Sequence, residues 1–165
     1  QRADPMNEDF LIRDYTKEDL PLVLDLLRLN TPVFFAPEEE KDYVQYLDHE
    51  LEWYYVIEVN KSVVGCGGIN FSGDPATGKI SWDLLHPDFQ GRALGTALLL
   101  HRIEKLKTFK DLLRIVVRTS QLAYRFYEKS GFSLLEKKED YWAKGFDLYL
   151  MELPLKENKK NNIGT

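Results

Sequence analysis

The stretch 85–98 has the residue types of a phosphate-binding turn. Its sequence, LHPDFQGRALGTAL, ends a predicted strand and begins a predicted helix. Free backbone N–H groups at a helix N-terminus, together with the positive end of the helix dipole, bind phosphate oxygens. Gly91, Ala93 and Gly95 leave room for a pyrophosphate at those amides, and Arg92 adds a positive charge. The segment predicts a site for a phosphorylated cofactor; the alternative is a tight strand-to-helix turn packed by small residues.

Neither of the two best-known phosphate loops fits, because the chain has no G-x-x-x-x-G-K-[ST] and no G-x-G-x-x-G after a first strand. The segment instead resembles motif A of the GCN5-related N-acetyltransferase (GNAT) family, [QR]-x-x-G-x-[GA]. That motif reads Gln90-Gly91-Arg92-Ala93-Leu94-Gly95 here, after the lead-in His86-Pro87-Asp88. Ala93 stands where the motif has its first glycine. The extra methyl group leaves the loop able to close round a pyrophosphate if φ there is negative, whereas a positive φ argues against tight CoA binding.

A second segment, residues 117–132, resembles motif B of the same family, N-x-x-A-x-x-[LF]-Y-x-K-x-G-F. Six positions match in register: Ala123, Phe126, Tyr127, Lys129, Gly131 and Phe132. Ser120 replaces the usual Asn, which shortens the reach of any hydrogen bond to the cofactor. The resemblance covers residues 11–153 in element order. It implies an α+β fold with three layers, α/β/α, in which a mostly antiparallel sheet has one parallel pair splayed at the cofactor site.

The resemblance also implies a reaction, the transfer of an acetyl group from acetyl-CoA to a primary amine of a small molecule or peptide. The amine attacks directly in a ternary complex, with no covalent enzyme intermediate. The implied pantetheine contacts are the main-chain groups of Asp83, Leu84 and Leu85. The implied pyrophosphate contacts are the amides of Gln90, Gly91, Arg92, Ala93, Leu94, Gly95 and Thr96, and Ser120 and Tyr127 complete the cofactor site.

Tyr127 is the implied donor to the leaving thiolate, because a thiolate that develops in a partly dry site needs a hydrogen-bond donor. The alternative is an aromatic side chain packed in the core. An alkylammonium with a pKa of about 10.4 must lose a proton before it attacks. Asp83 is the first candidate for that base, since it shares a strand face with Leu85. Glu58 is the second candidate and His86 the third.

The acceptor amine is expected where the first two predicted helices meet the open end of the sheet. The linker 31–37 joins those helices, and its aromatic residues, with Tyr141 and Trp142 later in the chain, are candidates to line the pocket. Acidic residues favour a cationic amine such as a polyamine, an amino sugar, a lysine or an N-terminal amine. They are Glu38, Glu39, Glu40, Glu139 and Asp140. An acidic run is also typical of a solvated helix start.

The hydrophobic periodicity predicts elements in the order that the motifs need. An apolar repeat at i, i+3, i+4 and i+7 indicates a first helix from Thr16, with Pro21 in its first turn. The glycines at 65, 67 and 68 interrupt a predicted strand and indicate a bulge or a close backbone approach. Further helices are expected from Pro37 and over 94–107 and 121–129. Strands are expected over 10–12, 53–59, 63–71, 80–85, 112–117, 132–135 and 146–153.

Composition narrows the function classes. The chain has 165 residues and a net charge of −5, which argues against a nucleic-acid partner. No apolar run reaches the length of a membrane span and no signal pattern is present, so a cytoplasmic location is expected. Cys66 is the only cysteine, and no cluster has metal-ligand spacing, so we expect no metal. We interpret residues 1–5 as preceding the natural start, 6–155 as one domain and 156–165 as a loose tail.

Two other functions stay open at this point. A non-catalytic module that binds CoA or acyl-CoA fits Ala93, Ser120 and the unassigned base. A nucleotide-binding or phosphotransfer domain shares only the phosphate turn and lacks an obvious acidic pair for Mg²⁺. Exposed aromatic residues in the late strands are compatible with a homodimer through a sheet edge.

Overall fold

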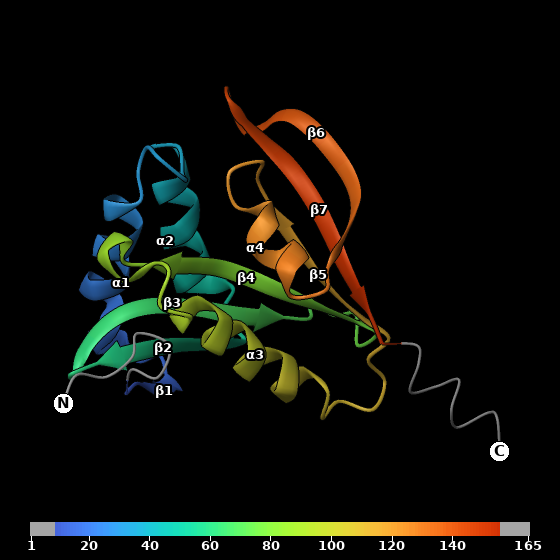
Figure 1. The fold of residues 1–165 in the computed structure, drawn as a ribbon, viewed down its shortest axis with the longest axis horizontal. Coiled ribbons are helices and arrows are strands. Elements are labelled where there is room, and N and C mark those ends of the chain that lie inside the picture. Colours follow the sequence, from blue (N-terminus) through green and yellow to red (C-terminus); the bar gives the residue numbers. More distant parts are fainter. Residues whose placement is uncertain (1–8, 156–165) are drawn as a thin grey trace, which may run out of the picture.

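The computed structural model describes residues 9–155, which form a seven-stranded sheet with helices on both faces (Figure 1). The first half contains β1 (Leu11–Asp14), the 3-10 helix η2 (Lys17–Asp19), α1 (Leu20–Leu29), α2 (Glu39–His49), β2 (Trp53–Val59) and β3 (Ser62–Asn70). The second half contains β4 (Thr77–Leu85), the 3-10 helix η3 (Pro87–Phe89), α3 (Leu94–Leu106), β5 (Arg114–Thr119), α4 (Tyr124–Lys129), β6 (Ser133–Ala143) and β7 (Phe146–Pro154). Every predicted element is present, in the predicted order.

The sheet has the order β1-β2-β3-β4-β5-β7-β6, and β4–β5 is its one parallel pair. That pair runs only from Thr77↔Arg114 to Ile80↔Val117. Both strands continue past this point without pairing to each other, and Figure 1 shows β5, β6 and β7 turning away from β4. The expected mixed sheet, splayed at its parallel pair, is confirmed.

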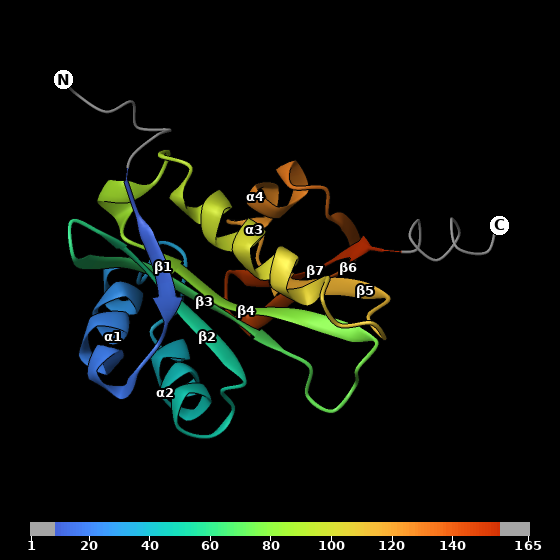
Figure 2. The same cartoon turned by 90° about the horizontal axis from the view of Figure 1, so that it is seen from below.

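Two hydrophobic clusters hold the layers together. Helices α1 and α2 cover one face of the sheet, and α3 and α4 cover the other (Figure 2). Leu99, Ile103 and Leu106 of α3 belong to one buried cluster with Ile115 and Val117 of β5. The opposite cluster joins α1 and α2 to β2 and β3, and it contains Cys66, which is fully buried. The three-layer α/β/α arrangement is therefore confirmed.

A β-bulge in β4 decides which side chains face which layer. The register between β3 and β4 shifts between Cys66 and Gly68, opposite Trp82, whose φ is +47°. The hydroxyl of Ser81 donates to Asn70, and the ring of Trp82 packs on Tyr43, so two successive side chains face the α2 layer. The bulge thereby turns the next residue, Asp83, toward α3. The glycines of β3 indicated a bulge or a close backbone approach, and the bulge lies opposite Gly67 in the neighbouring strand β4.

The boundaries of α4 and β6 differ from the prediction. Helix α4 begins at Tyr124 rather than at Gln121, because the backbone first makes a tight turn on the carbonyl of Ser120. Strand β6 runs to Ala143 instead of ending near Leu135. Its charged segment 136–140 lies on an exposed edge strand, where charge discourages edge-to-edge pairing. The predicted segments 1–5 and 156–165 lie outside the described residues. None of the helices in 9–155 combines the length and apolar character of a membrane span.

Candidate active site

The gap between β4 and β5 opens into a cleft of ≈ 1070 Å³. Its walls come from the end of β4, the turn before α3, helix α4 and the segment that joins α1 to α2. Ten of the predicted site residues line it: Asp83, Leu84, Leu85, Gln90, Gly91, Ala93, Gly95, Thr96, Ser120 and Tyr127. The side chains of the other two do not, since Arg92 stacks on Phe89 and Leu94 is buried in the core.

The turn before α3 presents unpaired amides to this cleft. Ala97 is the first residue whose amide donates within the helix, to the carbonyl of Ala93. Helix geometry therefore leaves the amides of residues 94–96 without an intrahelical acceptor. Ala93 is the N-cap and has a φ of +65°, and Gly91 has a φ of +80°. The φ of Ala93 is therefore positive, which is the conformation that argues against tight CoA binding. An alanine has a steric cost in this left-handed conformation that a glycine does not have.

The far end of β4 offers backbone groups at the open edge. The amide of His86 donates to the carbonyl of Val64 in β3, so the peptide groups of Leu85 face the opposite edge, toward the gap. The side chain of Asn30 already donates to the carbonyl of Leu85 at 3.0 Å. Asn30 is buried and lines the cleft from the end of α1. The first helix layer is thus fixed directly to the predicted pantetheine strand.

Asp83 and Tyr127, the predicted base and acid, are hydrogen-bonded to each other. The Tyr127 hydroxyl donates to Oδ2 of Asp83 at 2.5 Å. The other carboxylate oxygen, Oδ1, is ion-paired with Arg102 of α3. The Arg102 guanidinium has no solvent exposure and also donates to the carbonyls of Gly68 and Leu98. The three side chains form one network, which we call the Arg102–Asp83–Tyr127 triad.

Gly67 makes room for the triad. A Cβ atom at this position would lie 2.3 Å from Oδ1 of Asp83 and 2.6 Å from Nη1 of Arg102. No side chain fits at that distance, so the absence of one in β3 is what lets the buried ion pair form directly under the bulge.

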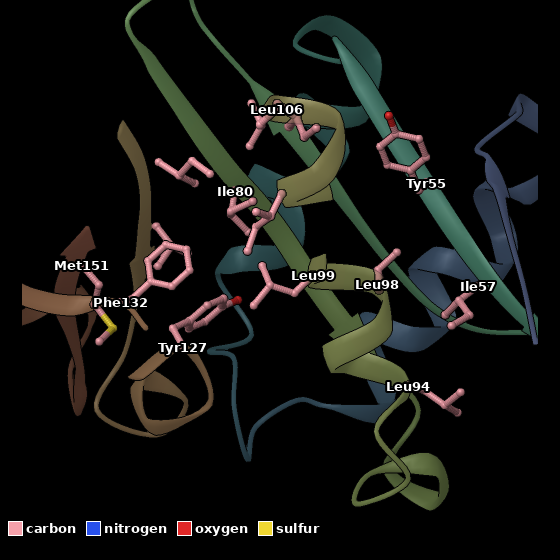
Figure 3. Close-up of a cluster of buried hydrophobic side chains, with 14 of the residues drawn as sticks. Tyr55, Ile57, Ile80, Leu94, Leu98, Leu99, Leu106, Tyr127, Phe132 and Met151 are labelled. Carbon is pink, nitrogen blue, oxygen red and sulfur yellow. The ribbon is translucent and has the colours of Figure 1, made fainter. Parts of the chain in front are cut away.

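Tyr127 is both a core residue and a cleft residue. Its ring packs edge-on against Phe126 and Phe132, and its side chain is almost fully buried. Figure 3 shows the ring beside Phe132, with its hydroxyl turned toward α3. Burial, and then the carboxylate of Asp83, raises the pKa of the Tyr127 phenol well above its ordinary value. The phenol therefore carries its proton at neutral pH, and in this structure it donates that proton to Asp83.

The other two base candidates lie elsewhere. Glu58 is ion-paired with Arg13 at 2.7 Å, on the outer strands of the sheet. The Nδ1 atom of His86 accepts from the amide of Asp88 and caps η3. Neither side chain lines the cleft, whereas Asp83 does. The geometry therefore favours Asp83 among the three.

The predicted acceptor end of the cleft is partly aromatic. Phe34, Phe35, Trp82 and Trp142 line it, while Tyr141 does not. Of the five acidic residues named from the sequence, only Glu39 lines the cleft, and its carboxylate accepts from the amide of Ala36. Glu40 pairs with Arg28 on the surface instead. The acidic run is mainly the solvated start of α2, so it gives little support to a polycationic acceptor.

The remaining sequence candidates have structural partners. The Ser120 hydroxyl accepts from the amide of Leu122, which leaves its own hydrogen to donate. The Sγ atom of Cys66 lies 3.5 Å from the Tyr43 hydroxyl and 3.4 Å from that of Tyr54. Burial raises the pKa of the Cys66 thiol to about 11, which makes it a poor nucleophile. No group of His, Cys, Asp or Glu among residues 9–155 is arranged to hold a metal ion.

Comparisons with known proteins assign the family. The model of the acetyltransferase (GNAT) family matches residues 21–132. An amino-acid acetyltransferase of Pasteurella multocida (strain Pm70) is 25% identical over 136 residues, which are 79% of this chain and 29% of the relative. An N-alpha-acetyltransferase of Saccharolobus solfataricus is 26% identical over 163 residues, covering 89% of this chain and 94% of the relative. The chain thus spans less than a third of the first of these two enzymes.

A solved structure has the same fold. The ribosomal-protein-S18-alanine N-acetyltransferase from Escherichia coli superimposes with a TM-score of 0.74 over 89% of this chain and 94% of the other, at 20% identity. The chain belongs to the acetyltransferase (GNAT) family. The resemblance of its two motifs to this family is confirmed.

Arg102 is the site residue that the motifs did not predict. It lies three residues after Leu99 and four before Leu106, so it occupies the face of α3 that the apolar repeat assigns to the core. A charged residue on a buried helix face needs a partner of opposite charge. An arginine among the apolar residues of this helix face was therefore the sequence signal for a buried ion pair, although only the bulge in β4 shows that the partner is Asp83.

Proposed function

We propose that this protein moves an acetyl group from acetyl-CoA to a primary amine by direct attack in a ternary complex. The observation that supports this is that one cleft is lined both by Gly95 and Thr96, whose amides have no intrahelical acceptor, and by Asp83 and Tyr127 of the triad. The amides offer a site for the pyrophosphate, and the open edge of β4 offers one for the pantetheine arm. A cofactor held in this way would place its thioester between β4 and β5, close to Tyr127.

Asp83 and Tyr127 would then carry one proton from nitrogen to sulfur. The amine nitrogen attacks the thioester carbonyl carbon, and Asp83 takes a proton from that nitrogen, directly or through a water. As the C–S bond breaks, Tyr127 gives its proton to the leaving thiolate and regains one from Asp83 along their 2.5 Å hydrogen bond. The products are the amide and CoA with a protonated thiol, so a neutral amine needs no net exchange of protons with solvent, whereas an ammonium first releases one proton.

The triad favours this reaction over a module that only binds CoA. Burying an arginine and a carboxylate is costly, even when the two groups are paired. A site that only had to grip the cofactor would not need an ion pair beneath the thioester. A nucleotide-binding role is disfavoured by the family assignment. The cytoplasmic location and the homodimer remain predictions.

The test is CoA release by the purified protein. Acetyl-CoA is incubated with a panel of amino acids, peptides, polyamines and amino sugars, and free thiol is measured. Turnover with at least one amine is expected, and stabilisation by CoA without thiol release would instead support the binding module. A matched pair of variants checks the site. Thr96→Pro removes one amide at the pyrophosphate position and should weaken CoA binding, whereas Lys17→Pro, at the first position of η2 and outside the cleft, should not.

A further inference from the structure

Arg118 stands at the point where the two central strands separate. The last paired residues are Ile80 and Val117, so Arg118 is the first residue of β5 beyond the pairing. Val117 belongs to the core under α3, and alternate residues of a strand face opposite sides. Arg118 therefore faces the side of the sheet that carries α1 and α2, and it lines the cleft there.

Aromatic side chains fix the direction of its guanidinium group. The Arg118 guanidinium lies 5.2 Å from the ring centre of Tyr141 and 5.4 Å from that of Trp142. It also donates to the Tyr141 hydroxyl, and the Trp142 indole is held by the carbonyl of Thr119. A guanidinium held by two rings loses less conformational freedom on binding a ligand than a free side chain does.

This cation has no carboxylate partner within residues 9–155. By contrast, Arg13, Arg28, Arg102 and Arg125 each pair with a carboxylate. The cofactor phosphates are not the obvious partner either. The turn that precedes α3 lies beyond Leu85. Ser81 is the residue of β4 that follows the last paired residue, as Arg118 does in β5, and Leu85 is four strand residues, or about 13 Å, further on. That turn also begins the helix layer on the other face of the sheet.

We propose that Arg118 binds a carboxylate on the acceptor, so that the acceptor is an amino acid or a short peptide whose carboxylate lies a few atoms from the amine. This inference rests on the proposed function. A planar guanidinium with parallel N–H groups matches a carboxylate in a two-point hydrogen bond. The amine of such an acceptor would reach the thioester at the strand opening, while the carboxylate contacts Arg118.

The experiment compares matched acceptors. CoA release is measured with a set of amino acids and dipeptides and with the corresponding C-terminal amides, which lack only the negative charge. The wild type should prefer the carboxylates by about tenfold or more in kcat/KM. Arg118→Gln should bring this ratio close to one, mainly by raising the KM of the carboxylate acceptors. Arg118→Lys should give an intermediate ratio, because lysine keeps the positive charge but cannot form the two parallel hydrogen bonds of a guanidinium. Arg28→Gln, an exposed arginine outside the cleft, is the matched control.

Thermal unfolding of each variant shows whether it is folded, which we expect because the Arg118 side chain is exposed. If the wild type uses the amides as well as the carboxylates, or prefers polyamines, the carboxylate inference is wrong while the proposed function stands. An unchanged preference in Arg118→Gln has the same meaning. If no amine releases CoA, the proposed function itself fails, and the inference fails with it.

Discussion

Removing the buried guanidinium of Arg102 should cost more stability than removing a surface arginine. Arg102→Met fills a similar volume but leaves the Asp83 carboxylate without its cation. Breaking a fully buried ion pair costs about 3–5 kcal/mol. The Asp83 side chain keeps 19% exposure, and this lowers our expectation to about 2–4 kcal/mol. For a domain of this size, that corresponds to a fall in Tm of about 5–15 °C.

The assay is urea unfolding followed by tryptophan fluorescence, combined with a double-mutant cycle. Asp83→Asn alone leaves the buried Arg102 cation without its carboxylate partner, whereas the double variant Arg102→Met/Asp83→Asn removes both charges. We therefore expect the double variant to lose at least about 1 kcal/mol less than the sum of the two single variants. The same non-additivity should appear in kcat, because Arg102 acts on the reaction through Asp83. Arg28→Met, whose ion pair with Glu40 is exposed, is the control and should lose little.

Strict additivity in both stability and kcat would refute the coupling between Arg102 and Asp83. A loss of less than about 1 kcal/mol for Arg102→Met would show that the guanidinium is not compensating a buried charge.

Three further predictions concern the cofactor turn, Gly67 and Cys66. Because φ at Ala93 is +65°, Ala93→Gly should leave the free energy of unfolding unchanged or raise it by up to about 1 kcal/mol. Ala93→Val should lower the free energy of unfolding and weaken CoA binding in calorimetry. An Ala93→Val variant with unchanged stability and unchanged CoA affinity would contradict this. Gly67→Ala should lower kcat by displacing Asp83, whereas Gly73→Ala, with no atom within 4 Å and a strained φ of +87°, should cost stability but not activity. Burial raises the pKa of the Cys66 thiol to about 11, from 9.0. The unfolded thiol therefore ionises first, and stability present below pH 9 is lost as the pH rises to 11, by about 3 kcal/mol. Cys66→Ala should lack this loss in pH-dependent urea unfolding, and an identical slope would contradict the burial argument.

The element order was predictable because periodicity and turn residues act locally. The apolar repeat of α3 and the glycine after α4 are examples, and the glycines of β3 indicated a bulge or a close approach without showing that the bulge lies in β4. The length of β6 was not predictable in this way. Its charged segment 136–140 has no buried face, and it is a strand because β7 offers a pairing edge.

The site could be predicted as far as the motifs reach. They predicted a cofactor turn at 90–96 and named Tyr127, and the strand face shared with Leu85 named Asp83, but neither showed that the two are hydrogen-bonded. The bond depends on a bulge at Trp82 that rotates Asp83 toward α3, and this is a long-range property of the β3–β4 register. The conformation at Ala93 was also beyond the sequence, since an alanine favours negative φ and only the strand-to-helix connection forces it positive.

The most direct test of the account is the turnover of Tyr127→Phe. The substitution removes only the hydroxyl that donates to Asp83 and keeps the ring that packs on Phe126 and Phe132. With saturating acetyl-CoA and an amine that the wild type uses, we predict a fall in kcat of about 10² or more, with CoA affinity within about twofold. An unchanged kcat would show that the phenol does not protonate the leaving thiolate and would contradict the proposed mechanism.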